Sequence, residues 1–540
     1  MISKPQIRKI FARLGAGIIS WSSYLSLFSL LILSISDLVA AEGRWIKIGS
    51  MHNFYQSYGC EPEMDFGNEQ QYGLRYPAFY DHQDIQAARG FWIGVKDFAD
   101  PVAEVTYPYK VAHVGPRARP SIEDNEFMPV KFGMKGRFSA PTVTVDREES
   151  SDLTWDDIVD DDGWDPLMGA DRMIYNTVHT STGITMDRKI YAYSQQYYDN
   201  FFVYEYVFTN TGICSADSSI THSNTLDSVY FHWQYRNAIA GEGTVEGDVI
   251  DFRGRRGWGT PQAMRWGRNT MNDVIGEDPD NPTYNAPYAE FEEMSYDEFT
   301  DEDEIMRGWY SWHGRFSTLT YDNLGSPNYQ GYLSDGMLGA YQYAGAVVLH
   351  ADVSTTDNGD DLSQPRTTRA LDSDGGDLRD NDQYNAERMR REYQKYMSPG
   401  HENLSQAEVI RSQNTFADQY AGTGGYSQSW AFGPYTIEPG ESVRIVMAEG
   451  VGGIDRMKAY SVGNTWYRNM VNNENVAMEM ADGNLTEDED DFKNSWVYSG
   501  RDSLIQTFRR AHRLFNDSLD LGEDRPPDPP QVFDIQSQGE

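Results

Sequence analysis

Two short segments of the chain concentrate aspartates closely enough to hold a cation. The first ends at Gly163, and the second surrounds Gly375 and Gly376. Calcium takes about six to eight oxygen ligands, which closely spaced carboxylates on a loop can supply. Neither segment has the EF-hand spacing of glycine and glutamate, so an acidic loop in water is the alternative interpretation. The candidate calcium ligands are Asp156, Asp157, Asp160, Asp161 and Asp162 in the first segment and Asp372, Asp374 and Asp377 in the second.

Tryptophans near arginines form a second group of candidates. Trp258 and Trp266 lie in the one basic stretch of an acidic chain, and Trp309 and Trp312 follow further on. Exposed tryptophan can stack on sugar rings, and arginine can bind acidic glycans. These four residues are the predicted binding site for a glycan or cell-surface polymer. The alternative is that they pack in the core, as large aromatic side chains usually do.

Catalytic motifs are missing from the sequence. It contains no H-E-x-x-H, no G-x-S-x-G and no phosphate-binding loop. A glycosidase needs two carboxylates, but 83 acidic residues are too many to single out a pair. Cys60 and Cys214 lack a zinc-site spacing. In an exported chain they can form a disulfide, and two buried free thiols are the alternative.

The N-terminus has the pattern of an export signal. Lys4 and Arg8 belong to a basic start, residues 14–36 are uncharged, and the small residues Val39 and Ala41 follow. This pattern predicts a signal peptide over residues 1–41, cleaved before Glu42. A retained membrane anchor is the alternative, because the uncharged run is long enough to span a bilayer. Cleavage would leave a secreted or cell-surface protein that is not inserted in the membrane.

Composition excludes two classes of protein. The net charge of −38 disfavours nucleic acid as a partner, since binding it requires lysine and arginine against phosphate. Acidic chains with few aromatic residues are usually disordered. This chain has 35 Tyr, 24 Phe and 13 Trp, so it is expected to fold around an aromatic core.

Hydrophobic alternation predicts the elements that must position these residues. Residues 200–210 alternate with both faces largely apolar, which is typical of an interior strand. Residues 434–449 read as a hairpin around Pro439 and Gly440. Helical spacing is confined to a few segments, mainly 383–397 and 504–515. The predicted fold is mainly β: an antiparallel β-sandwich with long acidic loops and a few peripheral helices.

Several stretches also resemble a group of large secreted bacterial proteins. They include WIKIGSMHNFYQSYGCE, FWIGVKDFADP, GPYTIEPGESVRIVMAEG and SGRDSLIQTFRRAH. In that group a Pro-rich spacer leads into a fibronectin type III-like domain and often a type IX sorting domain. The resemblance supplies no catalytic residues. It implies that the chain is a truncated N-terminal part of such a protein.

Three segments follow from this interpretation. Residues 1–41 are the expected signal peptide, and residues 42–520 the sandwich region, with two packed units and a break near 240–300 as one option. Residues 521–540 are the expected Pro-rich linker and the start of a fibronectin type III-like domain. The predicted function is a secreted or cell-surface, non-catalytic binding or structural protein, with calcium as a candidate stabilising ion. The alternative is an extracellular glycan-active hydrolase that uses a carboxylate pair.

Overall fold

The computed structural model describes most of the chain beyond the expected signal peptide. The described residues are 42–62, 73–78, 85–116, 126–138, 142–146, 148–149, 159–160, 162–239, 269–276, 306–317, 320–327, 335–373, 375, 382–420, 425–522, 525, 527 and 532–536. Contacts separate the chain into residues 1–42 and 43–540, and all elements below belong to the second unit. Across the described residues, no helix has both the length and the apolar character needed to cross a membrane.

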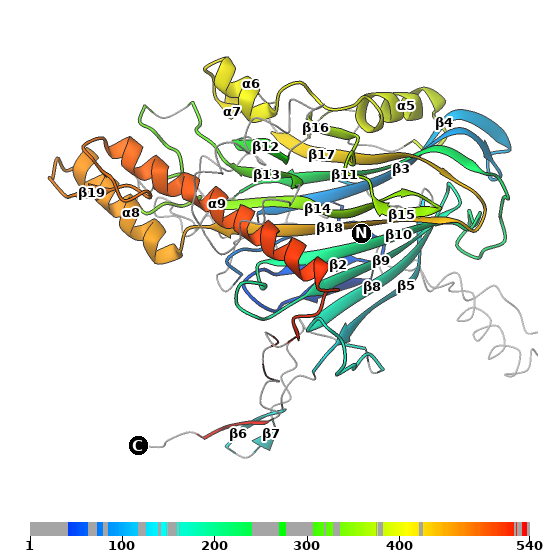
Figure 1. Ribbon diagram of the computed structural model, residues 1–540, viewed down its shortest axis with the longest axis horizontal. Coiled ribbons are helices and arrows are strands. Elements are labelled where there is room, and N and C mark those ends of the chain that lie inside the picture. Colours follow the sequence, from blue (N-terminus) through cyan, green and yellow to red (C-terminus); the bar gives the residue numbers. More distant parts are fainter. Residues whose placement is uncertain are drawn as a thin grey trace, which may run out of the picture. The chain divides into compact units, whose positions relative to one another are not determined.

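The larger of two main sheets has nine strands, and all its strand pairs are antiparallel (Figure 1). Its strand order is β12 (Thr270–Gly276), β13 (Arg307–His313), β14 (Gln342–Ser354), β18 (Ser442–Gly453), β10 (Phe201–Asn210), β9 (Ile184–Ala192), β8 (Arg172–Thr180) and β5 (Phe127–Gly136), with β15 (Asp357–Asp360) paired to β14.

The second main sheet has five antiparallel strands. Its order is β16 (Thr367–Asp372), β17 (Tyr426–Ile437), β11 (Leu226–Asn237), β3 (Gln86–Asp100) and β4 (Val105–Val114). Three small sheets complete the strands: β1 (Gly43–Ile46) with β2 (Asn53–Gln56), β19 (Met478–Glu479) with β20 (Leu485–Thr486), and β6 (Thr142–Val145) with β7 (Glu148–Glu149) and β21 (Val532–Ile535).

Aromatic rings fill the space between the two main sheets. The rings of Phe208 on β10 and Phe231 on β11 stack with centroids 3.8 Å apart. Trp233 on β11 packs against Tyr206 on β10 at 5.1 Å. These side chains belong to one core cluster that draws on both sheets. The predicted mainly β, antiparallel sandwich is therefore confirmed.

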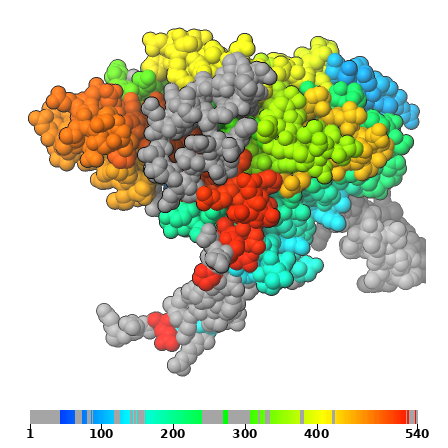
Figure 2. Space-filling view, viewed as in Figure 1, coloured from blue at the N-terminus to red at the C-terminus, as the bar shows by residue number. Residues whose placement is uncertain are grey.

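Helices cover the outer face of each main sheet (Figure 1). On the larger sheet lies α9 (Glu489–Asn516), which includes the predicted helix 504–515, with α8 (Arg456–Met470) beside it. On the smaller sheet, α5 (Ala386–Glu392) and the π-helical turn η4 (Tyr393–Met397) pack on Trp92 and Val111. The segment from α5 to α7, coloured yellow, forms part of the surface in Figure 2.

Glycines let α9 approach the sheet closely. Gly345 on β14 and Gly450 on β18 are cross-strand partners, and the ring of Phe508 lies against both of them. A β-carbon built on Gly345 would be 3.1 Å from the Phe508 ring, and one on Gly450 would be 3.3 Å from it. The two glycines therefore form a shallow slot that accepts the Phe508 ring.

One carboxyl group on α9 is expected to make stability depend on pH. Among the described residues, neither carboxylate oxygen of Asp502 has a hydrogen-bond partner, and the Nε of Arg501 is 3.6 Å away. Burial raises the pKa of Asp502 to about 6 from 3.8, although Arg501 opposes the shift. The native state therefore binds a proton more readily than the unfolded chain. The free energy of unfolding should fall as pH rises from about 4 to about 6.

Replacing this carboxyl group should stabilise the protein at neutral pH. Asp502→Asn removes the charge that burial disfavours, so we expect a gain of about 1–3 kcal/mol in the free energy of unfolding. Urea titrations of both proteins across this pH range measure the effect. If the variant keeps the pH slope of the parent protein, Asp502 is not its source.

Candidate functional site

A surface pocket of about 460 Å³ lies where the smaller sheet meets the segment around α6 (Gln406–Ser412) and α7 (Ala417–Tyr420). Figure 1 shows these two short helices beside β16 and β17. The described lining residues come from the middle of β16, the loop before α6, α6 itself, the end of α7 and the start of β17. They are Arg369, Ala370, His401, Glu402, Asn403, Leu404, Gln406, Val409, Tyr420 and Tyr426.

An ion pair forms the polar wall of this pocket. Arg369 donates from Nε to Glu402 Oε1 at 3.3 Å and from Nη1 to the carbonyl oxygen of Lys395 at 3.2 Å. The backbone N–H of Ala370 donates to Glu402 Oε2 at 3.3 Å. Burial raises the pKa of Glu402, and Arg369 acts in the opposite direction. The hydrogen bonds to the backbone orient the pair. Both side chains are about one-third exposed, so a ligand can still reach them.

Two tyrosines form the aromatic wall. The rings of Tyr420 and Tyr426 are 5.4 Å apart and inclined by 32°. Tyr420 is 37% exposed, and Leu404 on the pocket rim is 46% exposed. Burial, with Tyr420, Asp372 and Glu402 adding to it, raises the pKa of Tyr426 to about 12. Its phenol therefore stays protonated at neutral pH and can donate a hydrogen bond.

The floor of the pocket is held by backbone and amide hydrogen bonds. Gln406 Oε1 accepts from the backbone N–H of Asn272 at 2.8 Å and from its Nδ2 at 2.6 Å. Gln406 Nε2 donates to the carbonyl oxygen of Thr270 at 3.2 Å. A capping box between Ser405 and Glu408 fixes the start of α6. The floor is thus tied to β12 of the larger sheet and is preformed.

The predicted calcium ligands are only partly described. Asp156, Asp157, Asp161, Asp374 and Asp377 lie outside the described residues. Asp160 accepts hydrogen bonds from the Tyr175 hydroxyl at 2.8 Å and from the backbone N–H of Met134 at 3.1 Å. Asp162 and Asp372 are exposed. No three His, Cys, Asp or Glu side chains among the described residues are grouped as metal ligands, and the calcium site stays a prediction.

Two of the four tryptophans predicted to bind a glycan are described by the structure, and two are not. Trp258 and Trp266 lie outside the described residues. Trp309 and Trp312 are 1% and 5% exposed, so the exposed stacking surface predicted for them is wrong. Trp309 packs against Tyr235 at 4.7 Å between the sheets. Trp312 stacks on Tyr310 on the opposite face of β13, because layers cover both faces of this strand.

The disulfide prediction is also wrong. Cys60 and Cys214 are both free and both buried, which was the alternative interpretation. Burial raises the pKa of the Cys60 thiol well above its usual value and that of Cys214 to about 12. Both groups are therefore protonated thiols at neutral pH.

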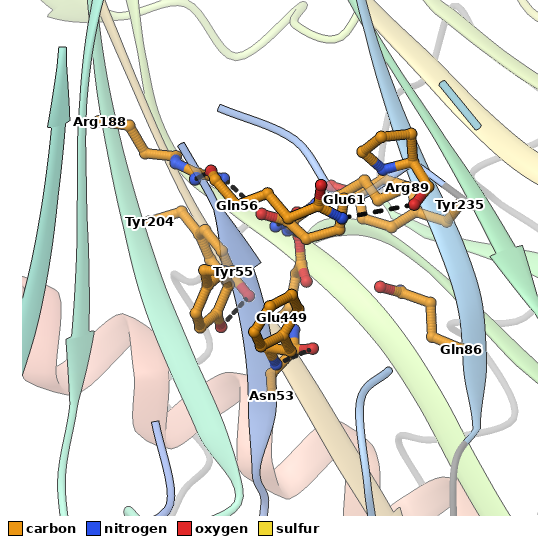
Figure 3. Close-up of polar contacts among 12 residues, drawn as sticks. Asn53, Tyr55, Gln56, Glu61, Gln86, Arg89, Arg188, Tyr204, Tyr235 and Glu449 are labelled. Atoms are coloured by element: carbon orange, nitrogen blue, oxygen red, sulfur yellow. Dashed lines mark hydrogen bonds and ion pairs between the residues drawn. The ribbon is translucent and has the colours of Figure 1, made fainter. Parts of the chain in front are cut away.

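A buried cluster of charges joins the two main sheets (Figure 3). Arg188 on β9 donates to Glu61 Oε1 at 2.9 Å, and Arg89 on β3 donates from Nε to Glu61 Oε2 at 2.7 Å. Arg89 also pairs with Glu449 on β18. Beside these ion pairs, the hydroxyl oxygens of Tyr55 and Tyr204 are 2.7 Å apart. All four charged side chains are buried, so the cluster links the sheets and is not a solvent-open site.

Sequence reasoning missed both the pocket and the cluster. One available signal was an isolated charge in an apolar strand, as with Arg89 in QAARGFWIGV and Glu449 in SVRIVMAEG. A charge at an inward-facing strand position needs a partner. No comparable signal marks Arg369, Glu402, Tyr420 and Tyr426, because β-pairing brings these residues together.

Comparisons with known proteins add little to this geometry. No family model matches the chain, and no curated protein matches it. A crystal structure named as a putative aldose 1-epimerase from Escherichia coli K12 matches 77% of this chain and 100% of that chain. The identity is 7% and the TM-score is 0.24. A likeness this weak carries no argument about fold or function.

Proposed function

We propose that this chain is a secreted or cell-surface, non-catalytic binding protein that holds a saccharide in the pocket between β16, α6 and β17. The observation that carries the proposal is the exposed Tyr420 and Leu404 beside the Arg369–Glu402 pair. Sugar rings have apolar faces that pack on aromatic side chains and hydroxyls that bind polar groups at their edges. The pocket offers both kinds of surface at one place.

Size and preorganisation support the same ligand class. A pocket of about 460 Å³ lies within the roughly 300–1,000 Å³ typical of small-molecule sites. Gln406 is fixed by its bonds to β12, and Glu402 is oriented by the backbone N–H of Ala370. Fixed polar groups lower the ordering cost of binding. A glycan or cell-surface polymer of the kind expected from the sequence fits this site.

A glycan-active hydrolase is the second candidate. The raised pKa of Glu402 is the property that a general acid needs. Glycosidases use a second carboxylate, and Glu402 is the one carboxylate among the described lining residues. Binding is therefore the function proposed. Release of reducing ends from a bound oligosaccharide would favour the hydrolase instead.

Removing the exposed ring is the direct test of saccharide binding. Tyr420→Ala should weaken binding about tenfold, because an aromatic contact contributes roughly 0.5–1.5 kcal/mol beyond the area it buries. Calorimetric titration with a panel of neutral oligosaccharides measures this change. Tyr384→Ala is the matched control, because Tyr384 is 53% exposed and does not line the pocket. Equal affinities for Tyr420→Ala and the parent protein would argue against this site.

A further inference from the structure

We infer that the pocket selects saccharides that carry a protonated amino group over those that carry a carboxylate. This inference rests on the proposed function and names its ligand class. It follows from three observations: Arg369 already donates to protein groups, the acids Glu402 and Asp372 lie near the pocket, and two tyrosine rings line it.

Arg369, the one arginine among the described lining residues, already donates to protein groups. Arg369 donates to Glu402 and to the carbonyl oxygen of Lys395. A ligand carboxylate would therefore have to displace Glu402 from Arg369 or lie next to it as a like charge. Both arrangements are unfavourable, since like charges at close range repel.

The remaining charge around the pocket is mainly negative. Glu402 lines the pocket, and both Glu402 and Asp372 act on the Tyr426 phenol by raising its pKa. Asp372 is the cross-strand partner of Tyr426 in the β16–β17 register, which places this second acid beside the aromatic wall. The whole chain carries a net charge of −38. The field in the pocket therefore attracts a cation.

The ring pair gives an ammonium group a second favourable contact. The rings of Tyr420 and Tyr426 are 5.4 Å apart and line the same pocket as Glu402, which is close enough to Tyr426 to raise the pKa of its phenol. An ammonium group within about 6 Å of a tyrosine ring gains a cation–π interaction. An amino sugar can place its ring on Tyr420 and its ammonium group near Glu402 at the same time. A uronic sugar can also place its ring on Tyr420, but it has no cation for Glu402 or for the faces of the tyrosine rings.

The test compares three oligosaccharides of equal length: glucosamine, N-acetylglucosamine and galacturonate oligomers. Calorimetric titrations are run below the pKa of the sugar amine, at physiological salt, with the full chain. We expect the glucosamine oligomer to bind at least about tenfold more tightly than the N-acetylated one, and the galacturonate oligomer to bind most weakly. Equal or tighter binding of the N-acetylated or galacturonate oligomer would overturn the inference.

Two variants separate this site from general attraction to an acidic protein. Glu402→Gln removes the charge and keeps one of the two acceptor oxygens that Arg369 and Ala370 use, so the preference for glucosamine over N-acetylglucosamine should be lost, whatever the change in either affinity alone. Glu387→Gln changes an exposed glutamate in the Arg390 pair on α5 and should preserve the preference. A preference that survives Glu402→Gln overturns the inference but not the proposed function. If none of the oligomers binds, both fail.

Discussion

Arg89→Met is expected to lower the free energy of unfolding by about 3–5 kcal/mol, because it leaves the buried carboxylate of Glu449 without its cationic partner. Arg89 contacts both Glu61 and Glu449 and is fully buried. After the substitution Glu61 retains Arg188, whereas Glu449 loses its ion pair with Arg89 in a site where burial already raises the pKa of Glu449. Urea denaturation gives the change directly from the shift in midpoint.

Two further variants test whether the effect comes from the unpaired, buried carboxylate of Glu449. Arg89→Met with Glu449→Gln removes both charges and should recover part of the loss, because a neutral amide is less costly to bury than an unpaired carboxylate. Arg390→Met breaks an exposed pair with Glu387 and should leave the free energy of unfolding nearly unchanged, because solvent screens such a pair. A loss below about 1 kcal/mol for Arg89→Met would mean that water or another group compensates Glu449.

Phe508→Ala is expected to cost about 3–5 kcal/mol, as truncation of a buried phenylalanine typically does. Its ring is fully buried and lies against Gly345 and Gly450. Neither glycine has a side chain that could relax into the space, so most of the cavity should persist. Thermal and urea unfolding measure the loss, with Met457→Ala as the control because Met457 on α8 is 65% exposed.

A substitution on the sheet tests whether the glycines are needed to accept the Phe508 ring. Gly450→Ala adds a β-carbon about 3.2–3.3 Å from Thr507, Phe201 and Phe508, which should cost about 1–3 kcal/mol through overpacking. Combined with Phe508→Ala, the added methyl group enters the vacated space. The double variant should therefore be less destabilised than the sum of the single variants. Strict additivity would show that Gly450 and Phe508 are not coupled.

Local pattern predicted much of the fold, because alternation and turn chemistry are local properties. Residues 201–210 form β10 with apolar residues on both faces. The hairpin predicted for residues 434–449 is wrong: its turn forms, with the N–H of Glu441 donating to the carbonyl oxygen of Glu438, but β17 and β18 lie in different main sheets and do not pair with each other. The segments 383–397 and 504–515 contain α5 with η4 and the second half of α9. In each case the hydrophobic period of the segment matches the layer on which it packs.

The candidate site could not be predicted in the same way, because it depends on non-local pairing. Arg369 and Tyr426 are distant in sequence, and only the β16–β17 register brings their strands together. Trp309 and Trp312 failed as binding residues for a related reason. A tryptophan in an alternating strand gives no sign that both faces of that strand are covered, and β13 is covered on both.

The state of the two cysteines has a practical consequence. Neither sulfur is bonded to the other, and both are enclosed and protonated, so the native fold does not depend on an oxidising compartment. A thiol reagent reacts with the thiolate of an accessible cysteine, and here it gains access only when the surrounding structure opens. The rate of alkylation at Cys60 and Cys214 therefore measures how often these two regions of the protein open, without any label having to be introduced.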